Sequence, residues 1–263
     1  MIKFFRKMRY DLMEGNKIGT YLKYAFGEIV LVVIGILIAL QLNNWNEFHK
    51  QRAIEVLILK ELLSDFNRDL LLLEQDVYLN KRAINSNQLI TGVLGGNAAY
   101  HDSLDLHFGS IQYNTQFTVN TGGFENLKSR GFEIISNDSI RKSIIELQDV
   151  VYDYLFTIGE RNNVISVELF NPKYLSYFTN FNSDFLENRV SFTPVKYSEL
   201  IGNTEFLQLI SYKKFINQGT VQVLENTIQL IHKLISKIET ELKYHPDNTI
   251  SVSENKKGIL LFC

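Results

Sequence analysis

The sequence predicts an all-α protein in which one N-terminal transmembrane helix continues into a bundle of long helices, with a small β-hairpin or irregular insert. Three observations lead to this prediction. Residues 25–42 form an almost uninterrupted apolar run. Three later regions of roughly 30 to 45 residues repeat apolar side chains at intervals of three and four, the period of a helix with one buried face. The prolines, Pro172, Pro194 and Pro246, lie between or after these regions, and proline disfavours a helix interior.

The apolar run contains only two strongly polar residues, Glu28 and Gln41. As an α-helix it measures about 27 Å, close to the hydrocarbon thickness of a bilayer, about 30 Å. Tyr24 and Trp45 flank the run and suit the two headgroup layers. A buried core helix and a cleavable signal peptide are the alternatives, but no Ala-x-Ala cleavage site follows the run. We therefore expect a membrane span over residues 24–45.

Basic residues are distributed unevenly around this span. Lys3, Arg6, Lys7, Arg9, Lys17 and Lys23 precede it, whereas Lys50, Arg52 and Lys60 follow it. Cytoplasmic flanks of membrane helices carry the excess of lysine and arginine. The sequence therefore predicts a cytoplasmic leader over residues 1–23, a helical domain outside the cytoplasm over residues 46–246, and a C-terminal tail over residues 247–263.

The leader is also amphipathic, because Lys3, Arg6, Lys7 and Arg9 cluster beside apolar residues at helical spacing. Such a segment binds an anionic membrane surface with its cations and its apolar side. The alternative is that these cations only determine topology. The lipid bilayer is the first partner that we expect on either interpretation.

One face of the predicted span is a candidate contact with another membrane helix. Glu28, Val32, Gly35, Ala39 and Leu42 follow one another at intervals of four and three, so a helix places them on one face. Gly35 and Ala39 form a small-xxx-small pair, which allows two helices to approach closely. We expect this face to contact a second copy or a membrane protein partner, where Glu28 would be satisfied.

The first long helix continues from the span through residues 47–90, which contain neither proline nor glycine. We expect its apolar seam to pack against later helices of the same chain, because further leucines broaden the stripe. A coiled coil with another copy is the alternative. Gly92, Gly95 and Gly96 should end the helix. The seam comprises Val56, Leu59, Leu63, Phe66, Leu70, Leu73, Val77 and Ile84.

Residues 97–136 are rich in glycine and asparagine and are predicted to be irregular. Within them we expect a short helix over residues 123–129, closed by Gly131, and we consider a hairpin over residues 108–119. Residues 136–138, Ser-Asn-Asp, are typical of the start of a helix.

A second long helix is predicted from Ile140 to about Leu169, where Pro172 should stop it. The stretch that follows is aromatic. It either packs onto the bundle or forms a partner surface made of Tyr174, Tyr177, Phe178 and Phe181.

The third long helix should begin near Asn203 and Thr204 and end near Tyr244, with Gly219 as a candidate break. Together the three regions predict an antiparallel bundle.

Composition argues against nucleic-acid binding and against an internal disulfide. The chain has a formal charge of −2, and residues 1–42 contribute +3, so the remainder carries −5. Nucleic-acid-binding domains carry a concentrated basic face, so we expect no nucleic-acid partner. The single cysteine, Cys263, excludes an internal disulfide, so the fold depends on its apolar core.

Catalytic and metal-binding patterns are weak. His101 and His107 could reach one metal from an extended strand, but a polar loop is the simpler interpretation. Residues 120–124 lack the lysine of a phosphate-binding loop. Cys263 has no predicted helix start or cation beside it that would make it a nucleophile. We therefore expect no metal, no cofactor and no enzymatic activity.

Two blocks resemble a known family. Residues 1–9 and 19–46, including Gly27-Glu-Ile-Val-Leu and Asn43-Asn-Trp-Asn46, are similar to the N-terminal signature of an uncharacterised family of single-span proteins from Bacteroidota, named as domain of unknown function 6090. Residues 121–131 and 134–138 resemble its second recurring block. The resemblance implies an inner-membrane protein with a helical periplasmic part, and it implies no activity.

The leading functional hypothesis is a membrane-anchored, non-enzymatic interaction or scaffold subunit that is oligomeric. The alternative is a periplasmic sensory or ligand-binding input domain. Because a leader of 23 residues is too short to be an output module, such a sensor would act through a partner protein. A pocket between the bundle helices would favour the sensor, and an exposed aromatic patch would favour the scaffold.

Overall fold

The computed structural model describes residues 18–184 and 189–244. The chain divides into two units, Met1–Ile54 and Glu55–Cys263. Helix α2, Ile18–Gly95, belongs to both units. The leader cluster of Lys3, Arg6, Lys7 and Arg9 and the tail with Cys263 lie outside the described residues.

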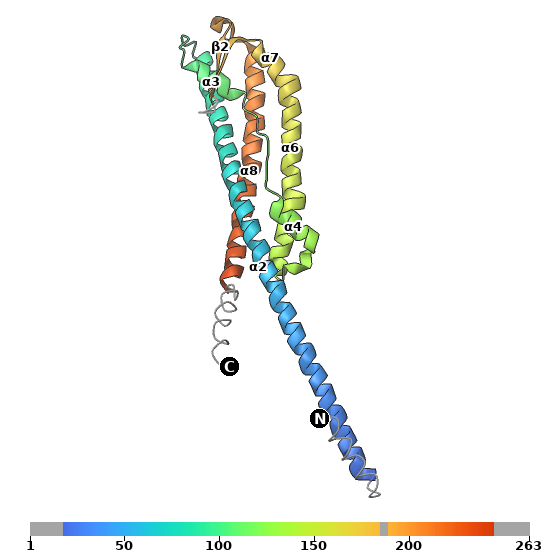
Figure 1. Ribbon diagram of the computed structural model, residues 1–263. Coiled ribbons are helices and arrows are strands. Elements are labelled where there is room, and N and C mark those ends of the chain that lie inside the picture. The colour runs from blue at the N-terminus through green and yellow to red at the C-terminus, as the bar shows by residue number, and fades with distance from the viewer. Residues whose placement is uncertain (1–17, 185–188, 245–263) are drawn as a thin grey trace. The chain divides into compact units, whose positions relative to one another are not determined.

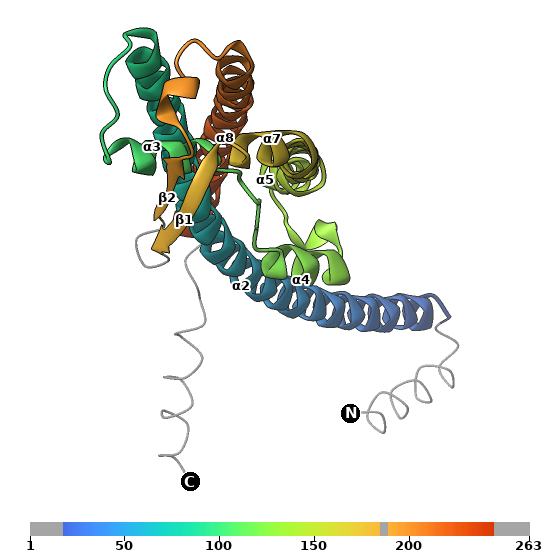
Figure 2. The same cartoon turned by 90° about the horizontal axis from the view of Figure 1, so that it is seen from above.

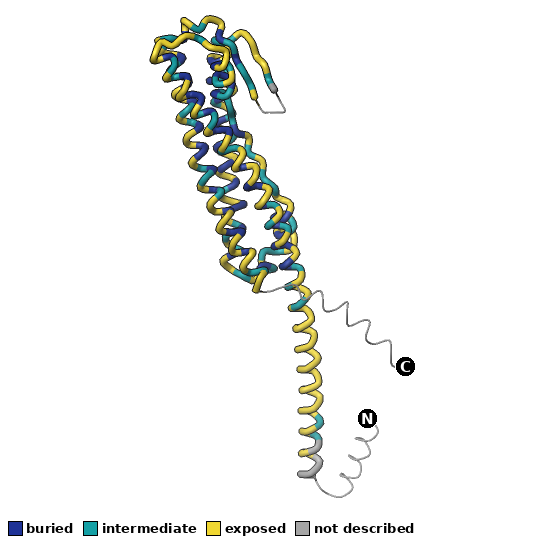
Figure 3. Tube along the Cα trace, turned by 90° about the vertical axis from the view of Figure 1, so that its left-hand side faces the viewer, coloured by how far each residue is buried: buried dark blue, intermediate teal, exposed yellow. Residues whose placement is uncertain are grey.

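The described part of the first unit is entirely helical. It holds the one segment in the described residues that is long and apolar enough to cross a membrane, and none of its most apolar window is buried. Residues 25–54 are all exposed or half-buried, as the colours of Figure 3 show. Trp45 lies at the end of this segment with its ring 4.6 Å from that of His49.

Three long helical stretches form the second unit (Figure 1). The first is α2 from Glu55 onward. The second runs through α5 (Asp138–Glu146), the π-helical segment η2 (Leu147–Tyr152), α6 (Asp153–Val164), the π-helical segment η3 (Ile165–Phe170) and α7 (Asn171–Leu175). The third is α8, Thr204–Tyr244.

Shorter elements connect these helices. Helix α3 is Leu104–Ile111, α4 is Gly122–Arg130, and the 3₁₀ turns η1 and η4 are Phe132–Ile134 and Tyr197–Glu199. Strands β1, Phe178–Asp184, and β2, Arg189–Pro194, pair antiparallel. Figure 2 shows the hairpin beside α3, and β2 packs against that helix. The prediction of an all-α protein with a small β insert is confirmed.

The core of the second unit lies where the three long helices face one another. Val56, Leu59, Phe66, Leu70 and Leu73 of the predicted α2 seam are buried. An aromatic cluster lies where α3, α7 and the hairpin meet the N-terminal part of α8. It contains Phe108, Phe170, Tyr174, Phe192 and Phe206.

Several predicted helix boundaries are confirmed. Helix α2 ends at Gly95, and Gly131 follows α4 with a φ of 96°, which glycine adopts without strain. Asn137 caps α5, since its Oδ1 accepts hydrogen bonds from the backbone N–H groups of Ser139 and Ile140. Asn203 caps α8 by accepting from the N–H of Phe206 at 3.0 Å.

Three expectations are wrong. Pro172 does not stop the second helix, because it lies in the first turn of α7, directly after η3. At that position its missing N–H is not needed. Residues 108–119 do not form a hairpin, because Phe108 lies in α3 and the hairpin is β1–β2. Gly219 does not break α8, which is continuous.

Candidate functional site

The predicted membrane-helix face lies within one uninterrupted stretch of α2. Val32 and Leu42 are 53% and 60% exposed, and Glu28 is half-buried. A Cβ added at Gly35 would meet nothing within 4 Å. The helix therefore places Glu28, Val32, Gly35, Ala39 and Leu42 on one side as expected, with open space beside Gly35.

The predicted aromatic partner surface is wrong for most of its residues. Tyr174 is fully buried, and its hydroxyl donates a hydrogen bond to the carbonyl of Phe108 at 2.7 Å. Tyr177 and Phe178 are half-buried and pack on the aromatic cluster. Phe181 alone of the four is exposed, at 62%. These rings pack inward because burying an aromatic side chain is strongly favourable.

His101 and His107 have different neighbours. His101 contacts the Ser103 hydroxyl, whereas His107 lies on α3, where its Nδ1 is 3.0 Å from the Ser86 Oγ. Across residues 18–184 and 189–244 no group of three or more histidine, cysteine or acidic residues is placed to hold a metal ion.

A row of acidic residues on α2, here called the carboxylate row, holds the segment between α3 and α5. It consists of Glu55, Glu61, Asp65, Asp69 and Asp76. The segment runs antiparallel to α2, because its successive residues bind successively earlier acids. In chain order, the Tyr113 hydroxyl donates to Asp76, and the Asn120 backbone N–H and side-chain amide both donate to Asp69. The Gly123 N–H donates to Asp65, and the Asn126 side-chain amide donates to Glu61. Finally, the N–H and the hydroxyl of Ser136 both donate to Glu55, and all these bonds measure 2.6 to 2.9 Å.

Asp69 is the most buried acid of this row, with an exposed fraction of 0%. Its Oδ1 accepts both Asn120 donors at 2.8 Å, and its Oδ2 accepts the Tyr152 hydroxyl at 2.7 Å. Burial raises the pKa of Asp69, and the hydrogen bonds from Tyr152 and Asn120 offset part of this effect. Burial likewise raises the pKa of Asp76. The carboxylate row therefore holds an irregular segment in place, although burying the charged form of Asp69 and Asp76 is unfavourable.

A buried lysine of α8, Lys213, contacts η3. The Lys213 Nζ donates to the Ser166 Oγ at 2.9 Å, and that hydroxyl donates to the Asn114 Oδ1 at 3.2 Å. The Nζ also lies 5.4 Å from the centre of the Phe170 ring. Burial lowers the pKa of Lys213 to about 8. A serine beside a lysine of lowered pKa is a nucleophile–base pair in some hydrolases, but Ser166 and Lys213 are only 2% and 1% exposed, so a substrate has no access to them here.

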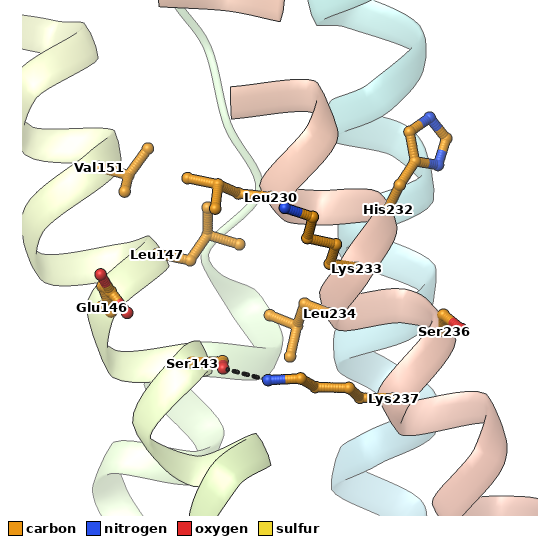
Figure 4. Close-up of a pocket in the computed structure, with 10 residues that line it drawn as sticks. All are labelled: Ser143, Glu146, Leu147, Val151, Leu230, His232, Lys233, Leu234, Ser236 and Lys237. Atoms are coloured by element: carbon orange, nitrogen blue, oxygen red, sulfur yellow. Dashed lines mark hydrogen bonds between the residues drawn. The ribbon is translucent and has the colours of Figure 1, made fainter. Parts of the chain in front are cut away.

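An open groove separates the α5–η2 stretch from the C-terminal half of α8. Its volume is about 640 Å³, within the range of small-molecule sites, about 300 to 1,000 Å³. Leu147, Leu230 and Leu234 point into the space between the helices (Figure 4). Val151 completes this apolar lining.

The polar residues of the groove lie on both of its walls. Lys233 and Lys237 follow one another by one turn of α8, and Ser143 and Glu146 lie on α5. The Lys237 Nζ donates to the hydroxyls of Ser139 and Ser143 at 3.1 Å, and Figure 4 shows the second of these bonds. The groove thus combines an aliphatic lining with two cations on one wall, and it is the best candidate for a binding site in the described residues.

Sequence reasoning missed the groove and the buried polar residues. For two of the buried polar residues the sequence does carry a signal, which is helical spacing from apolar neighbours. Asp69 lies three residues after Phe66 and four before Leu73, and Lys213 lies three residues after Ile210. The groove has no such signal, since its walls lie about 90 residues apart in the chain.

Comparison with known proteins identifies the family. No curated protein and no solved structure matches the chain. One family model, described as a family of unknown function (DUF6090), matches residues 28–181. This match begins in the apolar segment of α2 and ends in β1, and it covers more than half of the chain. The protein therefore belongs to the DUF6090 family.

Proposed function

We propose that this protein is a single-pass inner-membrane protein whose periplasmic helical unit serves as a non-enzymatic interaction subunit. The observation that supports this proposal is the run of exposed apolar side chains between Phe26 and Leu42. An exposed apolar surface of this length is strongly unfavourable in water, and a bilayer relieves that cost. The excess of basic residues before the span supports a cytoplasmic N-terminus.

Membrane anchoring is tested with the double variant Ile34→Lys and Leu37→Lys in the full chain. Each lysine near the centre of a span costs about 3 kcal/mol, so the variant should leave the membrane fraction on alkaline extraction while the native chain stays. Leu71→Lys is the matched control, because Leu71 is 68% exposed but belongs to the second unit. A native chain that is freely soluble without detergent would contradict the anchor.

Orientation and association are tested in native membranes. A protease added to spheroplasts should degrade the second unit, and protection of that unit would contradict the periplasmic location. Chemical crosslinking should trap this chain with a second copy or with a membrane protein partner. Recovery only as a monomer would contradict an interaction subunit.

A second candidate function is a ligand-binding input domain that acts through a partner protein. The groove between α5–η2 and α8 favours it, because a concave site with an aliphatic lining and a few polar groups is typical of small-molecule sites.

A further inference from the structure

We propose that the groove between α5–η2 and α8 binds a long-chain fatty acid, with the acyl chain on the aliphatic lining and the carboxylate at Lys233 and Lys237. This inference rests on the second candidate function and names its ligand class.

The lining of the groove fits an acyl chain. Leu147 and Val151 come from one helix and Leu230 and Leu234 from the other, so a chain lying between the helices contacts aliphatic side chains on both sides. Leu230 is 44% exposed and gains burial when the groove is filled. A peptide fits less well, because each residue brings a backbone donor and acceptor that need partners, and four aliphatic side chains provide none.

The charges of the groove fit an anionic head group. Lys233 and Lys237 are four residues apart on α8 and face the same groove. Lys237 bonds to two neutral hydroxyls, and among the described residues neither lysine forms an ion pair with a carboxylate. Glu146, on the opposite wall, repels an anion and directs it toward α8. A carboxylate between the two ammonium groups would form charge-assisted hydrogen bonds.

The test uses the full chain in phosphatidylcholine nanodiscs with hexadecanoic acid that carries a diazirine near its methyl end. After irradiation, labelled peptides are mapped by mass spectrometry. We expect label in residues 143–151 and 230–237, and competition by unlabelled hexadecanoic acid should be about tenfold stronger than by hexadecanol, which lacks the charge. Label in residues 25–42 reports contact with the bilayer in the same sample.

Variants separate the contributions of charge and shape. Lys233→Gln with Lys237→Gln should weaken competition by the acid about tenfold, to the level of the alcohol, whereas Lys243→Gln on the exposed end of α8 should change nothing. Leu230→Trp should fill the groove and abolish its label. Circular dichroism and thermal melting check that each variant is folded.

The outcomes distinguish this inference from the anchoring proposal. Label in residues 25–42 without label in the groove would overturn the fatty-acid site and leave the anchor standing. Label in the groove without label in residues 25–42 would contradict the anchor alone. Equal competition by acid and alcohol, or groove label that neither the double lysine variant nor Leu230→Trp reduces, would also overturn the inference.

Discussion

Lys213 places a basic side chain at a buried position of α8. Its ammonium group has three donors, and among the described residues it contacts the Ser166 hydroxyl and the Phe170 ring. Transferring a charge from water to such an environment is costly without an anionic partner. The folded state therefore makes the Lys213 ammonium easier to deprotonate than in the unfolded chain, and its pKa falls to about 8.

Replacing this lysine should change how stability depends on pH. Because the folded-state pKa of Lys213 is lowered from 10.5 to about 8, the unfolded chain binds the proton more tightly between these values. The native free energy of unfolding should therefore rise as pH increases through this window, by roughly 3 kcal/mol over its full width. Lys213→Met should remove that rise.

The measurement is denaturant unfolding between pH 7 and pH 9.5, which covers the lower part of this window and so part of the rise, followed by circular dichroism. Lys214→Met is the control for loss of a lysine at the next, less buried position. Parallel pH profiles for the native chain and Lys213→Met would contradict this account of Lys213.

Gly109 allows α3 to approach β2 closely. A Cβ at this position would lie 1.8 Å from the carbonyl oxygen of Val190, which is far inside contact distance. Gly109→Ala should therefore destabilise the second unit by about 1 to 3 kcal/mol or more. Gly219→Ala is the matched control, because its Cβ would meet nothing within 4 Å in the middle of α8. It should raise stability by about 1 kcal/mol, and thermal unfolding of both variants checks the contrast.

At the scale of the elements, α2 acts through its polar side as well as its apolar seam. The carboxylate row binds five successive points of the segment between α3 and α5. Without these acceptors, the backbone N–H groups of Asn120, Gly123 and Ser136 would need other partners. The row therefore specifies the path of a segment that has little regular structure of its own.

Asp69→Asn should alter the acid side of the stability profile. Because the folded-state pKa of Asp69 is raised above 3.8, its contribution to stability is complete below that pH and is lost as the pH rises through the folded-state value. Asparagine keeps an oxygen for the two Asn120 donors and does not ionise. The stability of the variant relative to the native chain should therefore increase from about pH 3.5 to pH 7.

This change is measured by urea unfolding across that pH range. Glu74→Gln, at an exposed position on the same helix, is the control. A constant difference between Asp69→Asn and the native chain would show that Asp69 has the same pKa in the folded and unfolded states.

The sequence was sufficient for elements whose signals are local. The α2 seam, the Asn137 and Asn203 caps and the Gly131 terminus each depend on a few neighbouring residues. The prediction failed at Pro172, where a π-helical segment precedes a new turn that tolerates proline. It also failed for the hairpin, because partial alternation in residues 108–119 resembled a strand, whereas Phe108 is buried from a helix.

The candidate site was less predictable than the fold for a physical reason. Leu147 and Leu234 are ordinary apolar residues of two predicted helices, and only the packing of α8 beside η2 brings them to one groove. Lys233 and Lys237 carry no local signal of binding either, because their relation to the opposite wall depends on the packing of the helices. Conversely, Tyr174 lies in an aromatic stretch that is typical of binding surfaces, but its ring is part of the buried aromatic cluster.

At the scale of the whole molecule, the open face around Gly35 leads to a prediction about association. If another helix packs there, Gly35→Leu should separate the two backbones and lower association of the full chain in membranes, measured by energy transfer between labelled copies. Val33→Leu, about half a turn away on the helix, is the control and should have little effect. Unchanged association of Gly35→Leu would count against this face as the contact between copies.

The acids that hold the irregular segment also determine how fast its amide hydrogens exchange with solvent deuterium. Loop amides usually exchange quickly, but those of Asn120 and Ser136 donate to the buried carboxylates of Asp69 and Glu55. We expect these two positions to exchange at rates typical of helix interiors, because exchange requires the segment to separate from α2. Fast exchange at both positions, measured by mass spectrometry, would show that the segment separates from α2 without unfolding of the bundle.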